Sequence, residues 1–276
     1  MTSHIGTDEA DRALKAKHRG MWALGNYPAV AIEVISELGP VLVAACGIAE
    51  GDRVLDVGAG SGNAAIPAAL TGAMVVASDL TPELFDAGRA AAAKCGAELK
   101  WQEADAEALP YGDGEFDAVM SCVGVMFAPH HLQSALELVR VCRSGGTIGL
   151  INWTPEGFIG QMFATMKPYA PPPPPGASPA PLWGDEDHVR ELFGDRVFDL
   201  DVRRQVVRIG RFGNAEAFRD FFKHNYGPTI AVYRTLGFDT ERVAALDHEL
   251  VELARRFGAD SGTMSWEYLL VTARCR

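Results

Sequence analysis

Three glycines at alternate positions follow a short apolar run, where they could form a ligand-binding loop. The run 53–57 ends in Asp56-Val57, and glycines stand at positions 58, 60 and 62. Without side chains such a loop lets the backbone approach a ligand closely, and the amides at the start of the next helix offer hydrogen bonds. The pattern predicts a loop that binds a nucleotide-like molecule between a buried strand and a helix.

The glycine spacing bears on which ligand this is. Dinucleotide-binding enzymes use a similar turn, but their fingerprint needs a third glycine three residues after the second. Asn63 occupies that place. The spacing therefore disfavours a pyrophosphate, although a nicotinamide-dependent oxidoreductase remains an alternative.

Two acids follow the next two apolar runs. Asp79 stands 17 residues after Gly62, where a carboxylate can accept both hydroxyls of a ribose, and Asp105 follows the run 98–102, where it can read an adenine edge. Each acid alone could be a helix cap or a solvated loop residue. In open α/β sheets, however, the carboxyl ends of adjacent strands lie together and bind ligands. The combination predicts a site for S-adenosylmethionine (SAM).

These segments resemble class I SAM-dependent methyltransferases over about residues 50–152. Residues 54–62 are similar to the first motif of that family and residues 77–80 to its acidic second-strand motif. Residues 103–111 with 116–119 look like the adenine loop and fourth strand of the ubiquinone/menaquinone-type small-molecule branch. Residues 138–146 match the turn into the fifth strand, with Ser144 where proline is usual.

The resemblance implies a Rossmann-like α/β fold: a seven-stranded, mostly parallel sheet with helices on both faces and an antiparallel last strand. It also implies roles for single residues. Asp56 and the loop backbone would hold the methionine part, Asp79 the ribose, and Leu80 would flank the adenine. The cofactor-binding residues expected in this way are Asp56, Gly58, Ala59, Gly60, Gly62, Asp79, Leu80, Asp105, Ala106 and Ser121.

Alternating strands and helices must position these residues. Apolar runs predict strands at 53–57, 74–78, 98–102, 116–121 and 147–152, with helices at 63–70, 81–95 and 131–142 between them. Thr81 is expected to cap the second of these helices, with Pro82 at its first position. Such β-α repeats require right-handed crossovers to a parallel sheet. After residue 184, helices are predicted at 185–193, 215–225 and 240–257, and the sixth and seventh strands at 197–209 and 263–273.

The chain divides into four parts of one domain. Residues 1–48 form a helical lid, with 7–47 helical, and residues 49–153 form the SAM-binding core. Residues 154–184 include five consecutive prolines, 171–175, and are expected to be an extended connector without regular helix. Residues 185–276 complete the core and carry a helical insertion for the substrate.

Aromatic residues and a histidine suggest the acceptor side. The segment 17–27 is expected to fold over the cofactor, with Tyr27 near its methionine end and Trp22 excluding water, or else to pack on the sheet edge. His130 is the candidate general base, although it could simply begin a helix. The segment 221–228, with Met162, Phe163 and Met166, could line an apolar acceptor pocket or belong to the core.

Composition narrows the function classes. The 276 residues carry a formal net charge of −11, which disfavours nucleic acid as a partner. Five cysteines without CxxC spacing indicate neither a disulfide framework nor a zinc ribbon, and no metal is expected. No signal peptide or membrane span is recognised, so a cytoplasmic protein is expected.

The sequence therefore predicts a methyltransferase that modifies O, N or C of a small apolar or aromatic acceptor. The alternatives are the oxidoreductase and a non-catalytic SAM-binding protein. The identity of the acceptor and the oligomeric state are left open.

Overall fold

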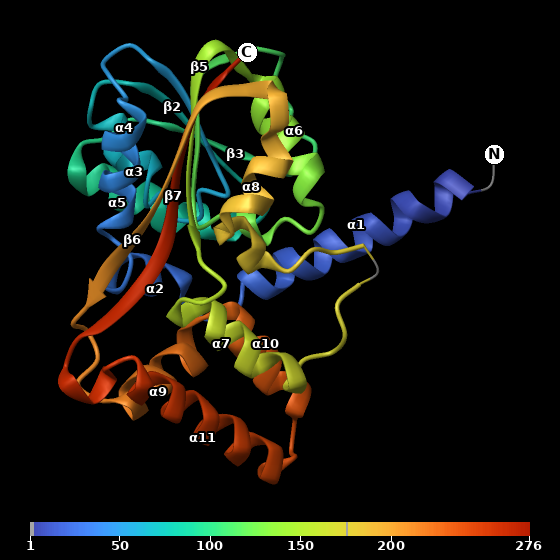
Figure 1. The fold of residues 1–276 in the computed structure, drawn as a ribbon, viewed down its shortest axis with the longest axis vertical. Coiled ribbons are helices and arrows are strands. Elements are labelled where there is room, and N and C mark those ends of the chain that lie inside the picture. Colours follow the sequence, from blue (N-terminus) through green and yellow to red (C-terminus); the bar gives the residue numbers. More distant parts are fainter. Residues whose placement is uncertain (1–2, 175) are drawn as a thin grey trace.

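A seven-stranded sheet lies at the centre of the computed structural model, which describes residues 3–174 and 176–276 (Figure 1). The strand order is β3-β2-β1-β4-β5-β7-β6. The first five strands pair in parallel, and β7 is antiparallel to both β5 and β6. The predicted fold class is therefore confirmed. The strands are β1 (Arg53–Val57), β2 (Met74–Asp79), β3 (Lys100–Glu103), β4 (Phe116–Cys122), β5 (Cys142–Trp153), β6 (Val197–Ile209) and β7 (Met264–Cys275).

Helices cover both faces of the sheet, because its inner strands are apolar and buried on both sides. One face carries α3 (Leu38–Cys46), α4 (Ala65–Ala69) and α5 (Phe85–Cys95), and the other carries α6 (His131–Val141) and α8 (Glu186–Phe193) (Figure 1). Short 3₁₀ helices join the elements: η1 (Pro82–Leu84), η2 (Val125–Phe127), η3 (Lys167–Tyr169), η4 (Ala180–Gly184), η5 (Gly194–Arg196) and η6 (Ala259–Ser261).

A second group of helices lies beyond one end of the sheet (Figure 1). It consists of α7 (Phe158–Met166), α9 (Ala215–Asn225), α10 (Gly227–Leu236) and α11 (Thr240–Arg256). The N-terminal helix α1 (Ser3–Trp22) reaches the junction between sheet and helical group, and α2 (Tyr27–Glu33) follows it. The chain thus places aromatic helices next to the sheet edge where the glycine loop begins.

Several local predictions were wrong. The segment 154–184 contains α7, because Pro155 and Pro168 leave a proline-free stretch whose apolar residues are buried against the core. Helix α10 was not predicted; Pro228 lies in its first turn, where proline is tolerated. Thr81 makes no side-chain capping bond and precedes a 3₁₀ turn. The helical stretch 7–47 is interrupted twice.

No single helix in the described part of the chain is long and apolar enough to cross a membrane; α2 and α3 reach that length and composition only as a pair, bent by 71°.

Candidate active site

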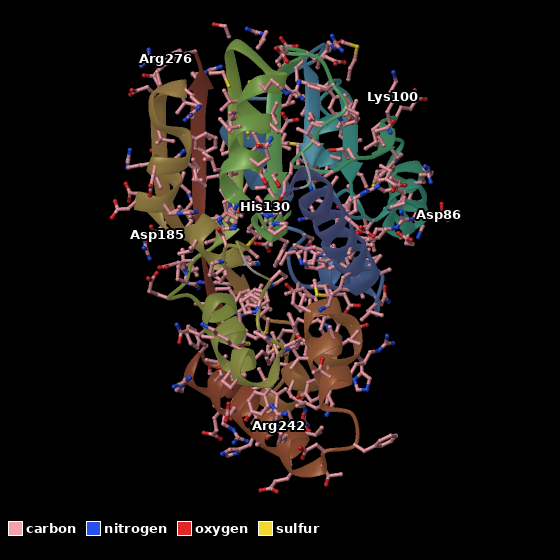
Figure 2. The ribbon with its side chains drawn as sticks, turned by 90° about the vertical axis from the view of Figure 1, so that its right-hand side faces the viewer. Asp86, Lys100, His130, Asp185, Arg242 and Arg276 are labelled. Carbon is pink, nitrogen blue, oxygen red and sulfur yellow. The ribbon has the colours of Figure 1, made fainter. Side chains whose placement is uncertain are left out.

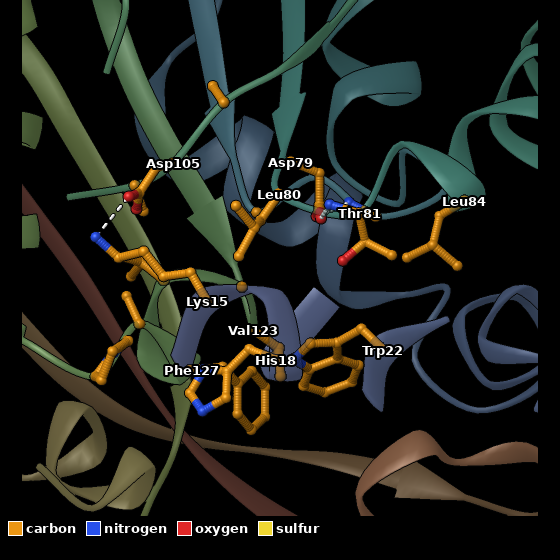
Figure 3. Close-up of a pocket in the computed structure, with 18 of the residues that line it drawn as sticks. Lys15, His18, Trp22, Asp79, Leu80, Thr81, Leu84, Asp105, Val123 and Phe127 are labelled. Atoms are coloured by element: carbon orange, nitrogen blue, oxygen red, sulfur yellow. Dashed lines mark hydrogen bonds and ion pairs between the residues drawn. The ribbon is translucent and has the colours of Figure 1, made fainter. Parts of the chain in front are cut away.

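A pocket lies at the carboxyl ends of β1, β2 and β4, beneath α1 (Figure 3). It brings together seven of the predicted residues from four separate segments: Tyr27, Gly58, Gly60, Asp79, Leu80, Asp105 and Ala106. Further lining residues come from α1, from the turn after β2, from the end of β3 and from the segment after β4: Lys15, His18, Trp22, Thr81, Leu84, Ala104, Val123, Gly124, Val125, Phe127, Ala128 and Pro129. The remaining predicted residues, Asp56, Ala59, Gly62, Ser121 and His130, are not part of this lining.

Asp79 ties the glycine loop to the end of β2. Its Oδ2 accepts a hydrogen bond from the Gly60 amide at 2.8 Å, and its Oδ1 accepts one from the Thr81 amide at 2.7 Å. Burial raises the pKa of Asp79, although these two amides oppose that rise. Gly58, Gly60 and Gly62 all have positive φ, which explains why the turn requires glycine. Asp79 lines the pocket, and each of its carboxylate oxygens can accept a second hydrogen bond.

The segment after β4 packs directly on the glycine loop. A Cβ atom on Gly124 would lie 2.4 Å from the carbonyl oxygen of Gly58, so both positions need glycine. The Ser121 hydroxyl donates to the Val57 carbonyl and accepts the Val125 amide at 2.8 Å, which holds the two segments together. Ser121 therefore supports the site from behind.

Val123 stands between these contacts with a φ of 55°. This is the left-handed region, which a β-branched residue rarely adopts and which costs about 1–3 kcal/mol. The neighbouring Gly124 contact and the bond from the Val123 amide to the Ile151 carbonyl at 2.8 Å maintain the conformation. Strain of this size is typical of a functional position.

Asp56 lies behind the loop and is almost completely buried. Neither of its carboxylate oxygens has a hydrogen-bond partner among the described residues. Burial raises the pKa of Asp56 to about 8; the nearby Ala65 amide opposes the rise and the Asp79 charge adds to it. An uncompensated carboxyl group at this depth is ready to receive a cationic or hydrogen-donating partner.

Asp105 is held by the N-terminal helix. Its Oδ2 contacts the Lys15 ammonium at 2.6 Å, and its Oδ1 accepts the Glu107 amide at 2.9 Å (Figure 3). Lys15 also contacts Glu107 at 2.9 Å, and one turn later Arg19 pairs with Glu83 and Glu103. These ion pairs fix α1 across the pocket.

The residues of α1 that face the pocket could have been recognised in the sequence from their helical spacing. Lys15, His18 and Trp22 recur at helical spacing and point toward the pocket (Figure 3). The polar appearance of the helix hid them, because only the folded chain shows which face meets the pocket. Trp22 was already expected to cover the cofactor.

His130 lies near the junction of the sheet and the helical group (Figure 2). Its Nδ1 is 2.9 Å from a Glu107 oxygen, and its amide donates to the other oxygen of that carboxylate at 2.6 Å. Ligand atoms of Asp11, Glu107 and His130 lie within 4.8 Å of one another, and the Lys15 ammonium contacts both of these acids. The group is therefore a charge network that joins α1 to the adenine loop.

A second cavity, the aromatic chamber, adjoins the pocket and shares Tyr27, Val123 and Phe127 with it. Phe222 and Tyr226 line it, as the segment 221–228 suggested, whereas Met162, Phe163 and Met166 lie outside the lining. Trp153 and Trp266, which the sequence did not single out, also face it. The whole lining is Tyr27, Val30, Ile35, Val123, Phe127, Trp153, Ile159, Phe222, Tyr226 and Trp266.

Comparisons with known proteins agree with this architecture. A family model described as "Methyltransferase domain" matches residues 55–150. The uncharacterized protein Rv1403c of Mycobacterium tuberculosis is 54% identical over 274 residues, covering 99% of each chain. A demethylmenaquinone methyltransferase of Mycobacterium sp. is 36% identical over 124 residues, 45% of this chain and 50% of that one.

A solved structure, that of a putative methyltransferase from Bacillus halodurans, has the same fold. It superposes with a TM-score of 0.55 at 21% identity, covering 87% of this chain and 98% of that one. The sheet order, the glycine loop with its acidic partners and the family match lead to one conclusion: the chain has the Rossmann-like methyltransferase fold, and its residues 55–150 form a methyltransferase domain.

Proposed function

We propose that this protein transfers a methyl group from SAM to a small-molecule acceptor. The observation that carries the proposal is the single pocket in which the glycine loop, Asp79 and Asp105 meet beneath α1. SAM supplies a methyl group on a positively charged sulfur, so attack by an aligned nucleophile suffices for transfer.

The charge of the pocket supports SAM over a dinucleotide. Two carboxylates, Asp79 and Asp105, line it against one ammonium group, that of Lys15, whereas SAM carries a sulfonium and an ammonium group. Opposite charges in a partly buried site attract each other strongly. The two phosphates of a nicotinamide dinucleotide would instead face the same carboxylates.

The proposed roles follow the surroundings of each residue. Asp79 binds the ribose hydroxyls through its free lone pairs, with Leu80 beside the adenine. Asp105 and Ala106 read the adenine edge, and Asp56 with the backbone of residues 58–62 holds the methionine part. Tyr27 packs on the loop: its ring lies 3.2 Å from where a Cβ of Gly60 would stand. We propose residues 3–48 as the lid over this site; residues 1–2, which the predicted lid also included, lie outside the described part of the chain.

The comparisons with relatives say less about the methyl acceptor than about the cofactor. The match to the demethylmenaquinone methyltransferase covers only part of the chain, so membership of that branch stays a prediction. His130 as general base also stays a prediction, since Glu107 holds its ring outside both linings. The acceptor class must therefore be argued from the residues of the chamber.

Calorimetric titration with SAM, S-adenosylhomocysteine and NAD tests the proposal. We expect binding of the two adenosyl-sulfur ligands and none of NAD, and each bound ligand should raise the melting temperature. Binding of NAD alone would favour the oxidoreductase. Binding of neither adenosyl-sulfur ligand would refute the proposal. Methyl transfer to acceptors then separates an enzyme from a non-catalytic SAM-binding protein.

A further inference from the structure

The aromatic chamber is built from six rings that come from distant parts of the chain: Tyr27, Phe127, Trp153, Phe222, Tyr226 and Trp266. Trp266 lies 5.8 Å from both Trp153 and Phe222, between ring centroids, and Phe222 lies 5.3 Å from Tyr226. The other lining residues are Val and Ile. No described residue of this lining carries a charged side chain, so the chamber is suited to an apolar molecule.

The chamber meets the cofactor pocket at three residues. Tyr27, Val123 and Phe127 belong to both linings, and the strained Val123 stands between them. Trp22 of the lid packs on this junction, with centroid distances of 4.6 Å to Phe127 and 5.7 Å to Tyr226. A molecule in the chamber therefore lies next to the pocket under the same lid.

Polar groups in the chamber are few and neutral. Burial raises the pKa of both Tyr27 and Tyr226, so both hydroxyls keep their protons at neutral pH. The indole N–H of Trp266 is buried without a hydrogen-bond partner among the described residues. Ring faces attract positive charge, whereas protonated tyrosines are poor proton acceptors.

We propose that the chamber binds the methyl acceptor, and that this acceptor is a neutral ring compound methylated on an amine nitrogen. The inference rests on the proposed function. The nitrogen lone pair forms the new N–CH₃ bond while the CH₃–S bond breaks and leaves its electron pair on sulfur. Positive charge thereby moves from sulfur to nitrogen, into the aromatic rings, and an N–H proton of the product passes to water after release.

Size and charge support this class of acceptor. The chamber is the smaller of the two cavities, so it suits a small acceptor rather than an extended one. Burial in an apolar space keeps an amine neutral until it is methylated. The acidic protein, with its net charge of −11, repels anionic acceptors.

The test uses two ligands of the same shape. Phenyltrimethylammonium mimics the methylated cation, and tert-butylbenzene is its neutral counterpart. Binding of each is measured by tryptophan fluorescence at saturating S-adenosylhomocysteine, which covers the acidic pocket. We expect the cation to bind about tenfold more tightly than the neutral molecule. It should bind more weakly with SAM in place, because the sulfonium repels it.

Three variants assign the effect to the chamber. Trp153→Leu and Tyr226→Leu each remove one ring and should reduce the preference for the cation severalfold, whereas Tyr226→Phe keeps the ring and should preserve it. SAM affinity, measured separately, shows that each variant is folded. Equal binding of the two ligands, or a preference that survives both leucine variants, would overturn the inference. Loss of SAM binding in the unaltered protein would instead refute the proposed function.

Turnover tests the atom that is methylated. N-methylaniline and phenol share one ring and differ in the nucleophile, and transfer is followed with SAM labelled in its methyl group. Faster transfer to N-methylaniline supports a nitrogen acceptor. Faster transfer to phenol would contradict it.

Discussion

The candidate cofactor pocket and the aromatic chamber share three residues yet are lined by different kinds of groups. The pocket uses carboxylates and a glycine backbone, with Asp79 and Asp105 in its lining. The chamber uses ring faces, with Trp153 and Trp266 at its back. Both environments favour positive charge, one through ionic groups and the other through aromatic quadrupoles. The proposed methyl transfer would therefore move positive charge between two environments that both favour it.

The two regions also differ in how they are held. The pocket depends on short backbone contacts between the glycine loop and residues 123–125, which leave no room for added atoms. The chamber depends on side-chain packing, which tolerates substitutions of similar volume better. Changes at the shared border should therefore disturb both regions, and changes elsewhere only one.

The largest effect is expected at that border, from Gly124→Ala. The new Cβ would meet backbone oxygen atoms of Gly58 and Val57 at 2.4 and 2.8 Å, so the two segments must separate. We expect a loss of about 3 kcal/mol in unfolding free energy and no measurable SAM binding, by urea denaturation and calorimetry. Gly213→Ala is the control, because nothing lies within 4 Å of its Cβ position. Normal SAM binding by Gly124→Ala would show that the contact is dispensable.

Asp79→Asn should weaken the cofactor pocket alone. The asparagine side chain keeps the shape of the aspartate but loses its charge. Its NH₂ group replaces one of the two oxygens, so either the Gly60 N–H or the Thr81 N–H loses its hydrogen-bond acceptor. We expect the dissociation constant for SAM to rise about 100-fold by calorimetry, since hydrogen bonds to charged groups are among the stronger ones. Asp86→Asn, at an exposed carboxylate, should leave SAM affinity unchanged. Similar affinities in the two variants would remove Asp79 from the site.

Asp56 should make the stability of the ligand-free protein depend on pH. Its folded pKa, about 8, lies above the unfolded value of 3.8, so the folded state binds the proton more tightly. Its contribution to stability is therefore complete below about pH 4 and falls by about 1.4 kcal/mol per pH unit as the pH rises toward 8. Urea denaturation at several pH values measures this slope.

The matched variant for this prediction is Asp56→Asn, which cannot titrate. Its stability should change less between pH 5 and 8 than that of the unaltered protein. SAM affinity of the unaltered protein should rise with pH over the same range, because the ionised carboxylate attracts the cationic ligand. Identical pH profiles for the two proteins would show that Asp56 is already ionised in the folded state.

The smallest effect is expected at the lid, from Lys15→Met. The substitution removes contacts to Asp11, Asp105 and Glu107, so α1 is held less firmly over the pocket. We expect SAM to dissociate about threefold faster in stopped-flow fluorescence, with less dependence on salt. Arg190→Met, which removes an exposed ion pair on α8, is the control. An unchanged rate would mean that the Lys15 ion pairs do not restrain the lid.

Much of the candidate cofactor pocket was predictable, because the motifs that form it are short segments of the sequence. A strand, three glycines and an acid at the end of the next strand have to meet wherever parallel strands share an edge. The meeting of Gly58, Gly60, Asp79 and Asp105 in one pocket was therefore predictable from their spacing. The parallel part of the sheet followed from the β-α repeats, whereas the antiparallel last strand was expected only from the family resemblance. Helices α7 and α10 were missed, because proline and glycine were weighted above the apolar periodicity beside them.

By itself the sequence determined the fold class, the glycine loop and its acidic partners, because each depends on residues close together in the chain. Only the tertiary structure decided the face that α1 presents, the pairing of Lys15 with Asp105 and the assembly of the chamber. Tyr27, Trp153 and Trp266 lie more than one hundred residues apart from one another. Their rings meet through long-range packing of helices and strands, which no local spacing records.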